Sequence, residues 1–473
     1  MRGLSVIIFL LNFNGQTIEG KRMNAPKLLI DSIEFLKGIV DNVEDLALLN
    51  ALNSKVANLV SLKGCTFKQF SNSSPRTMSY YCMSFMHSGT NKDYMVDCIN
   101  DHLLGFVKSE MDWHISDYKQ QYELEQMEVR KGKNAEKEIM AELDKIRVAN
   151  LEIANPNYTG LYREAEQITK TGFGSLYVRM GELGDYLENI ASGDKAKKEL
   201  YQKLKDIFEG TFYPTIIAGD GKRETLKNIP VQAYLYTDFD NLYKEKNREI
   251  YISSLKTGMA RRSFIYIPEN ENKKISYPKR YDLKEDSFYK AVELQKQFKN
   301  IFDMIRTKTV YTLSEESKEL LYQYQCQCID YFNNSNDNII VKLEKKESFW
   351  KITKLAVVYS IIDNPSNTVV SSQYVQMAID FYNLISPSLK RVIEKRKKSE
   401  IELYAEYIAN HKEEVITRTD LRNLNIINGN KFKKFFEEHF DEVKEELENV
   451  YGLLLYPYEN GKGNVRAFQV VKK

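Results

Sequence analysis

The sequence predicts an α/β core with a mostly parallel sheet, flanked by helical regions and followed by a small C-terminal module. Two observations carry this prediction. The first is a set of four short runs that are apolar without strict alternation, at residues 80–86, 176–180, 231–236 and 264–267. Such runs are typical of strands covered on both faces. The second is that stretches with helical spacing separate these runs, an alternation that favours parallel strands.

The length of 473 residues exceeds what one hydrophobic core usually holds. We predict an N-terminal helical region at 23–72, the α/β core at 73–283, a helical domain at 284–398 and the terminal module at 399–473. Inside the core, residues 120–149 are predicted as one long charged helix that projects outwards. It is either a solvated arm or an arm that contacts DNA or another subunit.

Composition limits the function classes. The net charge is +2, from 68 basic and 66 acidic residues, so any attraction to nucleic acid must be local. Five cysteines at irregular spacing do not indicate a disulfide framework, which favours a reducing, cytoplasmic compartment. The apolar segment 4–13 is too short to span a bilayer. It is either a buried strand or a product of translation starting upstream of Met23, and no membrane partner is expected.

The terminal module has a recognisable order of parts. A helix at 401–410 precedes a short helix, which Thr419 is expected to cap, and a third helix at 429–450. A hairpin follows, with a glycine-rich tip at 459–464. This is the layout of a winged helix. With 11 basic and 14 acidic residues, DNA binding requires one basic face, for which the candidates are Lys431, Lys433, Lys434, Lys462 and Arg466. The alternative is a module that docks a protein or is structural.

The loop after the first predicted strand has P-loop features. It reads Ser88, Gly89, Thr90, Asn91, Lys92, Asp93, and a helix follows. Strand, loop and helix in this order place Lys92 where a P-loop holds its phosphate-binding lysine. The full pattern has glycine at the positions of Met86 and Asn91, and a magnesium-binding hydroxyl at that of Asp93. The Asp93 carboxylate could reach the metal directly or through water. The alternative is a strand–loop–helix unit with this glycine and lysine by chance.

Polar residues end the next two predicted strands. The strand at 176–180 leads to Gly181 and Glu182, where an ATPase has Asp-Glu, the Asp near Mg²⁺ and the Glu polarising the attacking water. Glu182 keeps the second of these acids, and Asp185, one helical turn on, could replace the first. The alternative is an acidic pair at a helix start. Thr237 follows the run 231–236, where a residue that senses the γ-phosphate would lie.

Arg261 and Arg262 come directly before the fourth predicted strand. Two arginines at such a point are costly to bury without an anionic partner. In ring ATPases an arginine in this part of the chain reaches the nucleotide of the neighbouring subunit. The alternative is a salt bridge within the domain.

On these features the chain resembles a family. The loop 88–93, the segment 176–182, the segment 258–262 and the terminal module are similar to the primase- or helicase-associated P-loop ATPases of phages and mobile elements, which are related to superfamily-three and AAA+ helicases. The resemblance covers about residue 75 to the C-terminus. It implies an ATP-driven DNA helicase or translocase in replication, a homo-oligomer such as a hexamer, a primase or replisome partner, and the cytoplasm of a bacterial host.

The resemblance also implies ATP and Mg²⁺ as cofactors, and it assigns residues by position. Lys92 and its loop hold the phosphates, Glu182 activates water, Thr237 senses the γ-phosphate, and Arg261 or Arg262 acts on a neighbouring subunit. Two other hypotheses remain. One is a catalytically inactive ATPase fold that serves as a scaffold for DNA or for replication or packaging proteins. The other is a winged-helix regulator with an unrelated α/β sensor domain.

Overall fold

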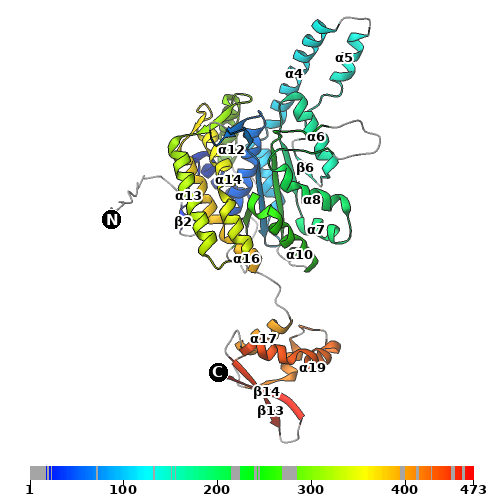
Figure 1. Ribbon diagram of the computed structural model, residues 1–473, viewed down its shortest axis with the longest axis vertical. Coiled ribbons are helices and arrows are strands. Elements are labelled where there is room, and N and C mark those ends of the chain that lie inside the picture. The colour runs from blue at the N-terminus through cyan, green and yellow to red at the C-terminus, as the bar shows by residue number, and fades with distance from the viewer. Residues whose placement is uncertain are drawn as a thin grey trace, which may run out of the picture. The chain divides into compact units, whose positions relative to one another are not determined.

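In the computed structural model the chain divides into two compact units, residues 1–394 and 395–473. The structure describes residues 17–18, 21–22, 24–70, 73–130, 134–150, 152–154, 156–214, 224–238, 242, 245–268, 285–394, 400–411, 415–424, 426–427, 429–448, 453–460 and 464–472. The two units are shown in Figure 1 and are treated separately below.

A five-stranded sheet lies at the centre of the first unit. Its order is β6-β7-β8-β5-β9, and each pair of neighbours is parallel. The strands are β5 (Tyr80–Met86), β6 (Ile153–Ala154), β7 (Leu176–Met180), β8 (Val231–Asp238) and β9 (Ser263–Tyr266). The predicted α/β core with a parallel sheet is therefore confirmed. All four apolar runs form strands of this sheet.

Both faces of the sheet are covered, as the continuous apolar runs predicted. Successive side chains of a strand point to opposite faces, so Tyr80 and Cys82 join one core while Tyr81 and Met83 join another. The helices of the first core include α1 (Lys27–Ile39), α2 (Asp45–Ser61), α12 (Glu285–Met304) and α14 (Ile339–Asp363). Those of the second include α6 (Tyr158–Thr171), α7 (Leu183–Ala191), α8 (Lys195–Ile207) and α10 (Glu245–Ser254).

Helix α2 is buried along nearly all of its length, which explains why its sequence is apolar on several sides. Two of its polar side chains are hydrogen-bonded to tyrosines of the sheet. The Tyr80 hydroxyl donates to Asn50 at 2.8 Å, and Ser54 and Tyr177 share a hydrogen bond of 2.9 Å. The helices predicted at 23–72 and 284–398 thus pack in the same compact unit as the sheet.

The first unit also contains a second sheet and further helices. A small sheet with the order β11-β10-β3-β4 joins distant parts of the chain. Its strands are β3 (Thr66–Lys68), β4 (Arg76–Thr77), β10 (Val310–Leu313) and β11 (Val369–Val370). The other elements are β1 (Thr17–Ile18), β2 (Lys21–Arg22), α3 (Lys92–Cys98), η1 (Ile99–Leu103), η2 (Leu255–Met259), α11 (Ala260–Arg262), α13 (Glu315–Asn334), α15 (Ser372–Ile385) and α16 (Pro387–Glu394).

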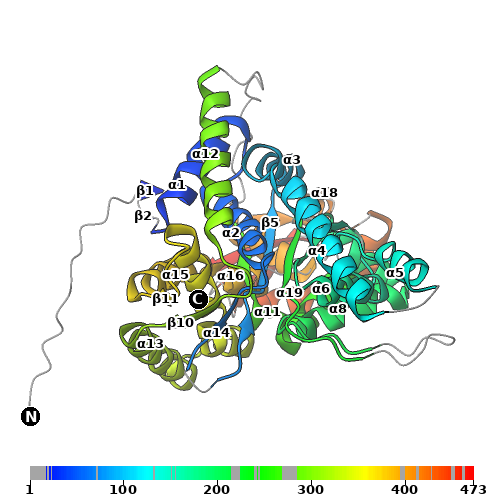
Figure 2. The same ribbon diagram turned by 90° about the horizontal axis from the view of Figure 1, so that it is seen from above.

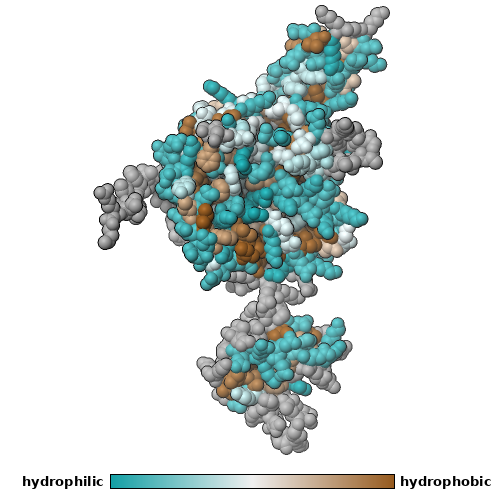
Figure 3. All heavy atoms as spheres, viewed as in Figure 1, coloured by the Kyte–Doolittle hydropathy of each residue, from teal (hydrophilic) through white to brown (hydrophobic). Residues whose placement is uncertain are grey.

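The prediction of a single helix at 120–149 is wrong. Two helices, α4 (Val107–Val129) and α5 (Ala135–Leu143), project together from the first unit (Figures 1 and 2). Arg130 ends α4 in an extended conformation, and its guanidinium pairs with Glu142 at 3.0 Å across the hairpin. Both helices carry the same kind of charged sequence, so the spacing of the charges did not reveal that the stretch divides in two. Apolar side chains remain exposed on this arm, among them Leu124 and Val129 (Figure 3).

The second unit has its own core and its own sheet. It contains α17 (Glu400–Asn410), β12 (Val415–Thr417), α18 (Arg418–Asn423), α19 (Gly429–Glu446), β13 (Leu453–Asn460) and β14 (Asn464–Lys472). The sheet is antiparallel with the order β12-β14-β13. The cap of α18 is Thr417, not Thr419 as predicted. Thr417 stands where β12 meets the helix, and it forms a capping box with Asp420.

The apolar N-terminal segment 4–13 and residues 461–463 of the hairpin tip fall outside the described residues. Among the helices that the structure describes, none is long and apolar enough to cross a membrane.

Candidate functional site

The candidate site lies at the carboxyl edge of the parallel sheet. Lys92 follows the end of β5, and Glu182 follows the end of β7. Because the strands are parallel, their carboxyl ends share one edge, and ligands of open α/β sheets bind outside that edge. β8 lies between β5 and β7, and its Asp238 pairs with Met86 at the end of β5. The strand order therefore brings the predicted lysine and the predicted acid to the same place.

Lys92 is 7% exposed, and its Nζ lies 3.6 Å from Oε1 of Glu182. Within the described part of the chain, no closer acid and no hydrogen bond satisfies this amine. A buried ammonium usually needs several partners, since leaving it unsatisfied is costly. Glu182 is 45% exposed at its side chain, so the pair opens to solvent on the acid's side. The arrangement suits an anion that approaches Lys92 from outside.

Glu182 has an uncommon backbone conformation. Its φ of 54° and ψ of 50° lie in the left-handed region, which costs a residue with a Cβ on the order of 1–3 kcal/mol. Two contacts hold the start of α7 in place. The Gly184 amide donates to the Thr237 hydroxyl at 3.3 Å, and Asn247 donates to the Gly184 carbonyl at 3.0 Å. Strain of this kind concentrates at functional sites.

The loop between β5 and α3 turns through Gly89, whose φ is 80°. The loop also uses some of its own polar groups. The Thr90 hydroxyl donates to the His87 carbonyl at 2.8 Å, and the Lys92 amide donates to the Thr90 carbonyl at 2.8 Å. The side chain of Lys92 is consequently the loop group that the structure presents most clearly for an anion.

Asp93, the next residue, belongs to a different cluster. Its Oδ1 accepts from Arg179 Nη2 at 3.1 Å and also from the hydroxyl of Tyr236. Arg179 Nε donates to the same hydroxyl at 2.8 Å. Arg179 Nη1 pairs with Asp97 at 2.8 Å and with Glu152 at 3.0 Å. Asp93 is thus part of an ion-pair network behind the loop.

The charges of this network shift its pKa values. Burial opposes the charge on Arg179, but hydrogen bonds with Tyr236 and Asp97 outweigh burial and raise the pKa of the guanidinium. Burial and the hydrogen bond to Asp93 raise the pKa of the Tyr236 phenol. Both groups therefore keep their protons at neutral pH, so Arg179 is a fixed cation and Tyr236 a neutral donor.

The sequence did not single out Arg179 or Tyr236. A signal for Arg179 was present, because a charged residue inside a strand of otherwise buried residues requires partners. Tyr236 gave no such signal, since tyrosine is abundant throughout the buried strands. Only the pairing of β7 with β8 brings the two side chains together.

A magnesium ion does not fit these residues well. Among the residues that the structure describes, no group of three or more His, Cys, Asp or Glu side chains is arranged to hold a metal ion. Asp93 is engaged by Arg179 and Tyr236, and Asp185 is an exposed residue in the first turn of α7. A Cβ added at Gly181, where an ATPase has its metal-directed Asp, would lie 3.0 Å from the Tyr236 hydroxyl.

The predicted arginines lie at the other end of the strands, where the strands begin. Arg261 and Arg262 precede Ser263, which pairs with Tyr81 near the amino end of β5. Arg262 Nη1 donates to the Gly258 carbonyl at 3.1 Å, and burial lowers the pKa of this guanidinium. Since β5 separates them from the loop, neither arginine belongs to the Lys92 site of its own chain.

In the second unit, Lys431 and Lys434 are exposed on α19, and Lys434 pairs with Glu438 at 3.7 Å. The side chains of Lys433, Lys462 and Arg466 lie outside the described residues. The predicted basic face is therefore described at two of its five positions.

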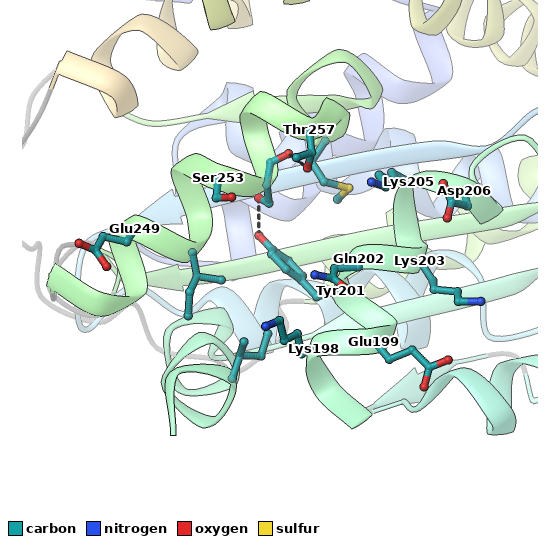
Figure 4. A pocket seen from close by; sticks show the side chains of 14 residues that line it. Lys198, Glu199, Tyr201, Gln202, Lys203, Lys205, Asp206, Glu249, Ser253 and Thr257 are labelled. Atoms are coloured by element: carbon teal, nitrogen blue, oxygen red, sulfur yellow. Dashed lines mark hydrogen bonds between the residues drawn. The ribbon is translucent and has the colours of Figure 1, made fainter. Parts of the chain in front are cut away.

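A hollow of about 770 Å³ lies elsewhere in the first unit, between α8 and the segment α10–η2 (Figure 4). Its wall includes the bases Lys198, Lys203 and Lys205 and the acids Glu199, Asp206 and Glu249. Bases and acids are equal in number, so the wall does not select a ligand by charge. Tyr201 points to Ser254 inside it and shares a hydrogen bond of 3.0 Å.

Searches of protein-family models and of curated protein sequences find no match to this chain.

Proposed function

We propose that this protein is a DNA-replication factor of phage or mobile-element type whose ATPase-like core binds a nucleotide and serves as a scaffold. The observation that carries the proposal is the pair Lys92–Glu182 at the carboxyl edge of the sheet, 3.6 Å apart. A buried lysine with one distant partner suits the phosphate chain of a nucleotide, because that chain supplies the missing acceptors.

The strand order supports an ATPase-like core. The strand that leads to Lys92 is internal, and the strand that contains Thr237 lies between it and the strand that ends before Glu182. Lysine, acid and hydroxyl then occur along the chain in the order expected for a P-loop ATPase and meet at one edge. Each motif is degenerate by itself, and their convergence is what supports the assignment.

A scaffold accounts for the metal-directed positions better than a motor does. Asp93 stands in place of a hydroxyl, Gly181 stands in place of a carboxylate, and P-loop hydrolysis relies on both groups to hold Mg²⁺. Binding a nucleotide without efficient turnover follows from these two replacements. The bound nucleotide would then stabilise the core or its assembly with partners.

The terminal unit supports an association with DNA. Its order of helix, strand, two helices and hairpin is similar to that of a winged helix, whose third helix reads DNA. In α19 the lysines 431, 433 and 434 lie near the helix start, whereas most of the acids follow later. We infer that DNA contacts the start of α19 and, through Lys462 and Arg466, the hairpin.

The second candidate is the ATP-driven helicase or translocase. Glu182 favours it, because this carboxylate is half exposed beside Lys92 and is available to polarise an attacking water. In that case Arg261 or Arg262 would serve a neighbouring copy in a hexamer, since both lie far from Lys92 in their own chain.

Nucleotide binding and ATP hydrolysis, each measured with and without single-stranded DNA, test both candidates. The variants are Lys92→Met and Glu182→Gln, with Lys198→Ala as the control, because Lys198 is an exposed lysine of the separate hollow. We expect the wild type and the control to bind ATP, Lys92→Met to lose at least about tenfold in affinity, and hydrolysis to stay at background. DNA-stimulated turnover that Glu182→Gln abolishes would establish the motor instead. A folded wild type that binds no nucleotide would refute both.

A further inference from the structure

Two positions direct a metal ion in a P-loop site: the residue after the lysine and an acid that follows a second strand of the sheet, here β7. In this chain they are Asp93 and Gly181, and the structure brings both to a single side chain. Asp93 accepts a hydrogen bond from the Tyr236 hydroxyl, and a Cβ at Gly181 would lie 3.0 Å from that same hydroxyl. Tyr236 therefore fills the space between the two metal-directed positions.

A cation is already present beside this hydroxyl. Arg179 donates to Tyr236 at 2.8 Å and to Asp93 at 3.1 Å, and its side chain is only 15% exposed. The guanidinium cannot lose its proton in a protein, so it supplies a permanent positive charge. A divalent cation at the same point would have to displace this guanidinium from the Asp93 carboxylate.

The guanidinium is also anchored on its other side. Asp97 and Glu152 bind Arg179 Nη1, and Glu152 in turn pairs with the buried Lys55 and accepts from Asn100 at 3.1 Å. Displacing Arg179 would leave these acids with one basic partner. The carboxylate of Asp93 is a weak metal ligand in this state, because the guanidinium balances its charge.

We propose that the Lys92 site binds the phosphate chain of a nucleotide without a divalent cation, with Arg179 and Tyr236 occupying the place from which the metal would be held. This inference rests on the proposed nucleotide site. It specifies that the nucleotide binds there without a metal ion. Lys92 supplies the direct contact with the phosphates. The Arg179 network, in which acids outnumber bases, holds Asp93 and Tyr236 in place beside the loop.

The test is the affinity of the full chain for ATP, measured by calorimetry in Mg²⁺ and in EDTA. We expect the two dissociation constants to agree within about threefold, and Lys92→Met to weaken binding in both buffers. Binding in Mg²⁺ that falls by more than about tenfold in EDTA would overturn the inference while leaving the nucleotide site in place. No binding in either buffer would instead remove the proposed function itself.

A designed reversal gives a second readout. The triple variant Asp93→Ser, Gly181→Asp, Tyr236→Phe restores a hydroxyl and a carboxylate and removes the phenol oxygen between them. We expect it to gain a dependence on Mg²⁺ of about tenfold or more, together with Mn²⁺ binding seen by electron paramagnetic resonance. When Mn²⁺ is added to the wild type with ATP, the spectrum should be that of Mn²⁺ bound to ATP free in solution. A distinct spectrum of protein-bound Mn²⁺ in the wild type would contradict the proposal.

Discussion

Two buried lysines, at opposite edges of the same sheet, differ in how fully their charges are satisfied. Lys351 on α14 is 3% exposed, and it donates to Glu344, to the Ser263 carbonyl at 2.7 Å and to the Ala260 carbonyl at 3.4 Å. Lys92 is nearly as buried, but its partner in the described structure is Glu182 at 3.6 Å. Saturated contacts indicate a structural lysine, whereas an incomplete set indicates a place for a ligand.

The largest expected effect is a loss of free energy of unfolding when Lys351 is replaced. Lys351→Met leaves Glu344, which is 4% exposed, with the Tyr382 hydroxyl at 2.7 Å as its remaining donor among the described residues. Removing one partner of a buried ion pair costs about 3–5 kcal/mol. Lys92→Met should cost less than about 1 kcal/mol, because the only ion pair it removes is the long contact with the half-exposed Glu182. Urea denaturation of the two variants checks this difference. Equal losses would end the distinction between the two lysines.

The next effect concerns the network that adjoins the Lys92 loop. Arg179→Gln leaves Asp93, Asp97 and Glu152 without their shared guanidinium. We expect the free energy of unfolding to fall by about 2–3 kcal/mol, at the low end for a buried pair because two of the acids are half exposed. Arg179→Lys should recover part of the loss, since the charge stays but the fork is missing. A stable Arg179→Gln variant would mean that the network is not structural.

A smaller effect depends on pH. Burial lowers the pKa of Lys354 to about 8, from 10.5 for the exposed side chain. Between these values the unfolded chain holds a proton that the folded chain has released, so this lysine makes the free energy of unfolding rise with pH. The limit is about 1.4 kcal/mol per pH unit. The measurement is the difference in free energy of unfolding between wild type and Lys354→Met from pH 8 to 10. Contributions from the titration of buried cysteines and tyrosines are common to both proteins and cancel in this difference. A flat difference would disprove the shift.

The smallest effect tests the strain at Glu182. Glycine adopts the left-handed conformation freely, and both Glu182→Gly and Glu182→Ala remove the carboxylate beside Lys92. The free energy of unfolding of Glu182→Gly should therefore exceed that of Glu182→Ala by about 0.5–1 kcal/mol. Glu182→Ala keeps the Cβ and should give no such gain. Thermal denaturation of the two variants side by side provides the measurement. A gain with alanine as large as with glycine would show that charge, not backbone conformation, sets the effect.

The sequence by itself determined the local elements and the edge of the candidate site. Continuous apolar runs predicted the four main strands, because a strand that is covered on both faces carries apolar residues on both and shows no polar alternation. Parallel strands also required Lys92 and Glu182 to lie at one edge. Local pattern did not reveal that the charged stretch divides into α4 and α5, because both helices carry the same kind of charged sequence.

The tertiary structure alone decided which side chains meet. The ion pair of Lys92 with Glu182, and the contacts of Asp93 with Arg179 and Tyr236, depend on β8 lying between β5 and β7. These residues are far apart in the chain, and strand order is set by packing of the whole core and not by any local preference. The metal-directed positions could be found in the sequence, but the meeting of the Tyr236 phenol and the Arg179 guanidinium beside them could not.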